Sequence, residues 1–150
     1  MTFVNKRPIW FMRQAGRYLP EYMKIRSKNS DFLKLCFNPD LAAEISLQPI
    51  RRFDLDFIIL FSDILVIPYA LGQEVKFLKN HGPHLNSITS KKDLNYTNLN
   101  KSLDKISNIF ETIRLLHAKK NKKNLIGFCG GPFTVLNYMI EGGTSKTHSK

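Results

Sequence analysis

Two short runs of apolar residues constrain the fold more than any other feature of the chain. The first, 57–61, reads Phe-Ile-Ile-Leu-Phe, and the second, 125–128, reads Leu-Ile-Gly-Phe. Runs of this length, free of charged residues and rich in β-branched and aromatic side chains, are typical of strands buried on both faces of a parallel sheet. The sequence therefore predicts core strands at 57–61 and 125–128.

Helical signals lie before, between and after these two runs. Pro20 can open a helix through residue 28, and Ser30 or Asp31 can cap a further helical turn over 32–36. Residues 7–19 show no clean period and are expected to be extended. The other expected elements are a helix at 38–52, a short helix ending before Gly72, a hairpin from residue 74 with its turn at 81–83, a helix at 99–119 and a helix at about 133–140.

Alternating helices and strands predict an α/β architecture with a parallel sheet. Two parallel strands do not make a covered sheet, and a closed eight-stranded β/α barrel takes about 250 residues or more. The chain has 150 residues and no internal repeat or linker. We therefore expect it to be the first part of a larger fold.

The formal charge of +11 raises the question of a nucleic-acid or membrane partner. Most of the excess is lysine scattered along the chain, and the one lysine run, within 119–123, is expected to be a solvated loop. No nucleic-acid-binding motif or aromatic-basic platform accompanies it, so no nucleic-acid partner is expected. The apolar stretch 57–71 is interrupted by Ser62, Asp63 and Pro68, so we expect no membrane span.

Cysteine and histidine give no sign of a metal site. Cys36 and Cys129 are the only cysteines, and they form no Cys-x-x-Cys pair. The histidines show no ligand spacing and are expected to be solvated; they are His81, His84, His117 and His148. Sparse cysteine and a start without an apolar leader favour a reduced, cytoplasmic compartment.

Arginine is scarcer than lysine and gathers near the N-terminus. Residues 13–17 read Arg-Gln-Ala-Gly-Arg, so two fixed cations flank small residues that let a ligand approach the backbone. Guanidinium groups bind carboxylates through paired hydrogen bonds, which suits a flat ligand with several negative charges. Two surface arginines at the start of a helix are an equally good interpretation of these residues alone.

Asp63 follows the first apolar run by two residues. Active sites of β/α barrels lie at the C-terminal ends of the strands, so an acid at this place is well positioned to meet a ligand. Ser62 or Asp63 can instead cap the helix that follows. On residue types alone, capping is the first interpretation.

Glycines at 130 and 131 follow the second apolar run, with Tyr138 and a further glycine pair at 142–143 beyond them. Glycine after a strand allows a tight turn or the close approach of a ligand. A phosphate-binding loop is only weakly supported, because neither Gly-Lys-Ser nor Gly-x-Gly-x-x-Gly is present.

Three blocks of the sequence resemble the uroporphyrinogen decarboxylase family, in the family's order. They read RPIWFMRQAGRYLPEY, LQPIRRFDLDFIILFSDILVIPYALG and LIGFCGGPFTVLNYMIEGG. The likeness runs from about Arg7 to Ser145, and the first block is a long and unusual string. A corrinoid or methionine-synthase-type methyltransferase shares the barrel type but relies on zinc-binding Cys and His clusters that this sequence lacks.

The resemblance implies a fold and an activity. The family forms a TIM-type (β/α)8 barrel, so residues 1–150 are expected to be the incomplete N-terminal part of one barrel domain. Family members are homodimers that need no cofactor. They decarboxylate the four acetate side chains of uroporphyrinogen III to give coproporphyrinogen III in haem biosynthesis. The family's later hydroxyl and histidine residues have no counterpart here, so an inactive fragment that keeps part of a tetrapyrrole-binding surface is the alternative.

The resemblance also implies site residues. Asp63 would stabilise the transition state, and Arg13 would act beside it as a second catalytic group. No metal is implied. The implied substrate-binding residues are Arg13, Gln14, Ala15, Gly16, Arg17, Asp63 and Tyr138.

Overall fold

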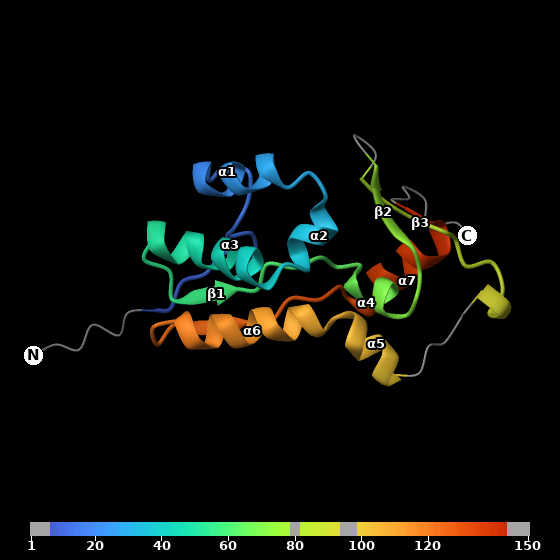
Figure 1. Ribbon diagram of the computed structural model, residues 1–150. Coiled ribbons are helices and arrows are strands. Elements are labelled where there is room, and N and C mark those ends of the chain that lie inside the picture. Colours follow the sequence, from blue (N-terminus) through green and yellow to red (C-terminus); the bar gives the residue numbers. More distant parts are fainter. Residues whose placement is uncertain (1–6, 79–81, 94–98, 144–150) are drawn as a thin grey trace, which may run out of the picture.

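Two short parallel strands form the centre of the fold (Figure 1). The computed structural model describes residues 7–78, 82–93 and 99–143. Strand β1 (Phe57–Ile59) pairs with β4 (Asn124–Ile126), and Ile58 lies opposite Leu125. Both expected core strands are present, which confirms the parallel α/β prediction.

Both strands end earlier than their apolar runs. The Phe61 N–H donates to the Ser46 Oγ at 2.8 Å instead of to a neighbouring strand. One hydrogen bond beyond the paired residues, from the Leu60 N–H to the Ile126 carbonyl at 3.0 Å, still joins the two segments. The predicted ends at 61 and 128 are therefore wrong, and at Phe61 a side-chain contact replaces the ladder.

Three helices precede β1, each beginning where local signals indicated. The Asp31 carboxylate accepts from the Lys34 N–H at 3.1 Å, so Asp31 rather than Ser30 caps the second helix. The Asn38 side chain accepts from the Leu41 N–H at 3.0 Å and caps the third. These helices are α1 (Pro20–Lys28), α2 (Phe32–Cys36) and α3 (Pro39–Arg52).

An excursion follows β1, and it contains the expected antiparallel hairpin. Val75 pairs with Leu85 in the hairpin. Position 81 of the predicted turn lies outside the described residues. The prediction is wrong for Gly82 and Pro83, which pair with β2 as part of the second strand. The elements are α4 (Val66–Ala70), β2 (Val75–Leu78), β3 (Gly82–Leu85) and a 3-10 turn, η1 (Lys91–Asp93).

The helix predicted over 99–119 is two helices, α5 (Leu99–Lys105) and α6 (Ser107–Lys119). The helix is interrupted at Ile106, whose N–H donates to the Leu103 carbonyl three residues before it. Packing explains the break, because α5 contacts α4 while α6 continues against α3. Leu103 consequently lies exposed rather than in the core stripe.

The last described helix, α7 (Pro132–Glu141), begins at a proline and ends at Gly142. Gly142 has φ of +77°, and its N–H donates to the Tyr138 carbonyl at 2.9 Å. A left-handed residue of this kind ends many helices, and glycine adopts it without a steric penalty.

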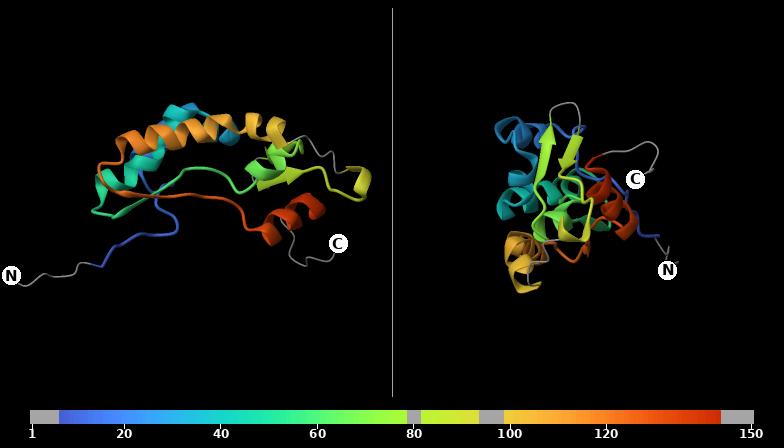
Figure 2. Two further views of the ribbon diagram at one scale, coloured as in Figure 1. Left: turned by 90° about the horizontal axis from the view of Figure 1, so that it is seen from below. Right: turned by 90° about the vertical axis from the view of Figure 1, so that its right-hand side faces the viewer.

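Helices α3 and α6 cover one face of β1, as the views in Figures 1 and 2 show. Ile58 is fully buried between them, whereas Phe57 and Ile59 on the other face are half-buried. The expectation of strands buried on both faces is therefore met on one face only for β1 and on neither face for β4. The buried cluster consists of Ala43, Leu47, Ile58, Leu60, Val66, Ile109 and Leu116.

The Ser46 hydroxyl ties α3 to the end of β1 and gives a first test. It donates to the Ala42 carbonyl at 2.7 Å while accepting from the Phe61 N–H. We expect Ser46→Ala to lower the free energy of unfolding by about 1–3 kcal/mol, because a buried N–H loses its partner. Urea denaturation measures this loss.

Ser27→Ala is the matched control. The Ser27 hydroxyl donates to the Lys24 carbonyl at the exposed surface of α1. Its removal should change the free energy of unfolding by less than about 0.5 kcal/mol, because water replaces the bond. Equal losses in the two variants would contradict the role assigned to Ser46.

Candidate functional site

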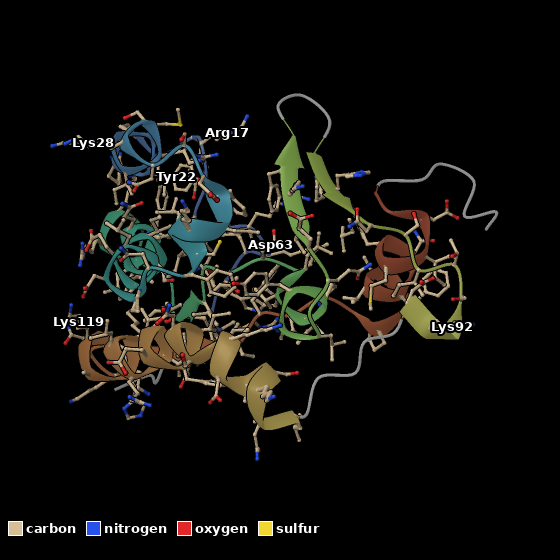
Figure 3. The ribbon with its side chains drawn as sticks, turned by 45° about the vertical axis from the view of Figure 1, so that its right-hand side comes forward. Arg17, Tyr22, Lys28, Asp63, Lys92 and Lys119 are labelled. Carbon is tan, nitrogen blue, oxygen red and sulfur yellow. The ribbon has the colours of Figure 1, made fainter. Side chains whose placement is uncertain are left out.

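An open pocket of about 370 Å³ lies where β1 ends. The N-terminal extended segment, helix α2, β1 with its following loop, and Phe128 two residues after β4 all contribute to it. Figure 3 shows Asp63 between the α1–α2 side of the molecule and the hairpin. The lining residues are Met12, Arg13, Gln14, Ala15, Phe32, Ile59, Leu60, Phe61, Ser62, Asp63 and Phe128.

The chain that leaves β1 carries Asp63 into the pocket. Ile58 and Leu60 belong to the core under α3 and α6. From Ile59 onward every residue to Asp63 lines the pocket, Leu60 included. Core packing of β1 therefore anchors one end of the continuous stretch that forms this side of the pocket.

Asp63 both stabilises the local turn through a hydrogen bond and lines the pocket. Its Oδ1 accepts from the Leu65 N–H at 2.8 Å just before α4, so the capping interpretation accounts for one oxygen. Burial raises the pKa of the Asp63 carboxyl, and the Leu65 hydrogen bond partly offsets this rise. Within the described residues the carboxylate has no ion-pair partner, so it can accept hydrogen bonds from a ligand.

Arg13 reaches the same pocket from the extended segment that precedes α1. That segment lies along β1, since the Asp56 N–H donates to the Ile9 carbonyl at 3.0 Å. The next residue, Gln14, is buried, and its Nε2 donates to the Phe57 carbonyl at 2.9 Å. Arg13 itself is exposed. The structure therefore brings Arg13 and Asp63, distant in sequence, to one cavity.

Three predicted site residues do not line this pocket. Arg17 is exposed beside α1, near Tyr22, whose pKa is raised by burial and lowered by the charges of Arg26 and Arg17 (Figure 3). Tyr138 on α7 packs against the buried cluster under the hairpin. Neither Arg17 nor Tyr138 is among the described residues that line the pocket, and neither is Gly16.

Sequence reasoning missed the aromatic wall of the pocket. Phe32, the first residue of α2, packs edge-on against Phe61 with ring centroids 5.8 Å apart. The Arg26 guanidinium carbon lies 5.9 Å from the Phe32 centroid. The period-two pattern through Phe61 to Asp63 could have revealed Phe61, but nothing local to Phe32 signals its position.

Cys36, the last residue of α2, is buried close enough to Asp63 and Arg26 for their charges to act on its thiol. Burial raises the pKa of Cys36, the charge of Asp63 raises it further, and the charge of Arg26 opposes both. The protonated thiol therefore adds no charge beside Asp63. In the part of the chain that the structure describes, no group of histidine, cysteine and acidic side chains could hold a metal ion.

Other arginines are paired with acids on the surface. Arg52 forms a two-pronged pair with Glu21, and Arg51 bonds to Glu44. No such pair involves Arg13 or Arg17 over residues 7–78, 82–93 and 99–143, so both remain available to an anionic ligand. No helix in these ranges is both long enough and apolar enough to span a membrane.

Comparison with known sequences points to one family. The family model described as Uroporphyrinogen decarboxylase (URO-D) matches residues 3–150. The chain is 48% identical over 149 residues to a protein named uroporphyrinogen decarboxylase in Psychromonas ingrahamii, covering 98% of this chain and 42% of that relative. It is 51% identical over 137 residues to the protein of that name in Orientia tsutsugamushi, covering 91% and 40%. The chain thus spans about two fifths of the length of these relatives.

A solved structure shares the fold. A methyltransferase from Methanosarcina mazei superposes with a TM-score of 0.68 over 91% of this chain and 41% of that chain. The sequence identity is 19%, so the likeness shows the fold alone. It supports the prediction of an incomplete β/α barrel.

Gly130 lets the segment after β4 pass the turn beside Asp63. A Cβ there would lie 2.5 Å from the Val135 Cγ2 and 2.7 Å from the Ile64 carbonyl oxygen. We expect Gly130→Ala to destabilise the fold by about 1–3 kcal/mol, because the backbone must shift. Gly127→Ala is the control, since nothing lies within 4 Å of its added Cβ. An equal fall in the unfolding temperature of the two variants would contradict the role assigned to Gly130.

The raised pKa of Asp63 makes stability depend on pH. Because the folded chain holds this proton more tightly than the unfolded chain, its contribution to stability is present below the unfolded pKa of about 3.9 and is lost as pH rises through the folded pKa. Asp63→Asn should therefore unfold at higher urea concentration than the parent at neutral pH, and the difference should vanish in acid.

Asp93→Asn gives the opposite control for this pH dependence. Hydrogen bonds from Thr89 and Ser90 lower the pKa of Asp93, so its contribution is present at neutral pH and lost in acid. An Asp63→Asn variant that is less stable than the parent at neutral pH would contradict the sign argued for Asp63.

Proposed function

Because the chain belongs to the uroporphyrinogen decarboxylase family, we propose that it binds uroporphyrinogen III and, as part of a complete barrel, removes its four acetate carboxyl groups to give coproporphyrinogen III. The observation that carries the proposal is the meeting of Arg13 and Asp63 in one pocket. An unpaired cation and a buried acceptor suit a substrate with carboxylates at its rim and pyrrole N–H groups at its centre.

The chemistry of the substrate explains why side chains are sufficient. An acetate on a pyrrole cannot lose CO2 until the ring can accept the electron pair of the breaking bond. Protonation of a ring carbon makes the pyrrole a cation, which accepts that pair as CO2 leaves. A proton then adds to the methylene carbon, and the ring carbon gives up its added proton to restore the pyrrole. We therefore propose a carboxy-lyase that needs no cofactor.

The proposed site residues other than Gln14 have the following roles in this scheme. The Asp63 carboxylate accepts hydrogen bonds from the pyrrole N–H groups and stabilises the cation that forms. Arg13 and Arg17 neutralise substrate carboxylates, and Tyr138 donates a hydrogen bond to one of them. The small residues Ala15 and Gly16 leave room for the macrocycle. We assign Arg13 to binding and charge neutralisation, because a guanidinium is a poor proton donor.

The proposal extends to assembly and compartment. We expect a cytoplasmic homodimer with uroporphyrinogen as its partner, and neither nucleic acid nor membrane. Free Cys36 and Cys129 fit a reducing compartment. Scattered lysines, several of them paired with acids at the surface, fit a solvated face better than a nucleic-acid surface.

A second candidate is binding without turnover. The pocket is open on one side, and the chain spans about two fifths of its relatives. Water that enters an open site weakens the electrostatic stabilisation that decarboxylation requires. On this alternative the chain alone binds the tetrapyrrole but releases no CO2, whereas a complete barrel does both.

A chimera separates the two candidates. It joins residues 1–150 to the part of the Psychromonas ingrahamii relative that lies beyond the matched segment. We expect the chimera to convert uroporphyrinogen to coproporphyrinogen, and Asp63→Asn to lower its kcat about 10²–10³-fold through loss of a preorganised charge. Chromatography of the oxidised porphyrins measures the products.

Asp40→Asn is the control for this test. Asp40 is exposed in the first turn of α3 and does not line the pocket. It should keep kcat within about twofold. A folded chimera without product would contradict the proposed decarboxylase, and an Asp63→Asn variant with near-parental kcat would reduce Asp63 to a turn residue.

A further inference from the structure

The side chain of Gln14 fastens the N-terminal segment to the central strand. Only 4% of the residue is exposed. Its Nε2 donates to the carbonyl of Phe57, the first residue of β1, at 2.9 Å. Its Oε1 accepts from the Phe11 N–H at 3.2 Å. Both ends of the amide are therefore engaged by backbone rather than directed at a ligand.

The backbone of Gln14 is held as firmly as its side chain. The Tyr18 hydroxyl donates to the Gln14 carbonyl. The Tyr18 ring stacks on Phe53, with centroids 6.4 Å apart, and Phe53 follows α3 directly. One residue is thus fixed to β1 through its amide and to the end of α3 through its carbonyl.

These contacts join the two chemical groups of the pocket. Arg13 precedes Gln14 in the chain, and Asp63 follows β1, the strand that Gln14 grips. The bond from the Gln14 amide to the Phe57 carbonyl is therefore the link nearest to Arg13 between its segment and the strand that leads to Asp63; the bonds between Ile9 and Asp56 lie further from it along the chain. Arg13 is exposed and has no ion pair with the described residues, so packing of its own side chain does not set its place.

We propose that Gln14 is a positioning residue that holds Arg13 at the correct distance from Asp63, and that it aids substrate binding through Arg13 rather than by contacting the substrate. This inference rests on the proposed decarboxylase activity. Only an amide of this length can both donate to Phe57 and accept from Phe11. Glutamate lacks the donor, and methionine has nearly the same shape but lacks both groups.

The test uses Gln14→Met in the chimera described above. We expect kcat/KM to fall about 10–100-fold, because a misplacement of about 1 Å can cost 10²-fold. Gln73→Met is the matched control. The Gln73 Nε2 donates to the Asn86 carbonyl at 2.6 Å, away from the pocket, so its loss should lower thermal stability but leave kcat/KM within about twofold.

An Arg13→Ala background distinguishes positioning from general loosening. If Gln14 acts through Arg13, adding Gln14→Met to Arg13→Ala should lower kcat/KM no more than about twofold further. Multiplicative losses in the double variant would overturn the inference, and so would a Gln14→Met variant that resembles Gln73→Met. These outcomes leave the decarboxylase proposal intact. An unsubstituted chimera that forms no coproporphyrinogen would overturn both proposals.

Discussion

Burial of Ile58 and Leu60 between α3 and α6 determines where the rest of the site lies. The same stretch of chain continues from this core to Asp63, and all its residues from Ile59 onward line the pocket. Asp63 is therefore anchored through a strand that apolar packing holds in place. The same packing fixes the Phe57 carbonyl that receives the Gln14 amide, so core and pocket share one strand.

The pocket combines a buried carboxyl group, that of Asp63, with an exposed guanidinium, that of Arg13. Asp63 is kept in surroundings that favour its neutral form, with a single backbone donor in partial compensation. Arg13 remains in water on the rim. Such an arrangement is unfavourable for the empty fold and favourable for a ligand that brings its own donors and anions. Residues held at a cost to stability are typical of sites selected for binding or catalysis.

Local chemistry made much of this structure predictable, and long-range contacts explain the remainder. The caps at Asp31 and Asn38 depend on residues three positions away, and the strands depend on composition alone. Asp63 could be located because the end of a buried strand is a site in barrels. Arg17 lies in the turn in which the Leu19 N–H donates to the Gly16 carbonyl, and it does not line this pocket. Phe32 enters the pocket only through tertiary packing.

The pairing of β1 with β4 has a consequence for how the chain is made. A hairpin and three further helices separate the two strands in sequence. A ribosome adds about 5–20 residues per second, so β1 emerges several seconds before its partner exists. During that interval only α3, already synthesised and tied to Phe61 by Ser46, can shield its apolar face. The order of synthesis thus leaves α3 to cover the apolar face of β1 until β4 has been made.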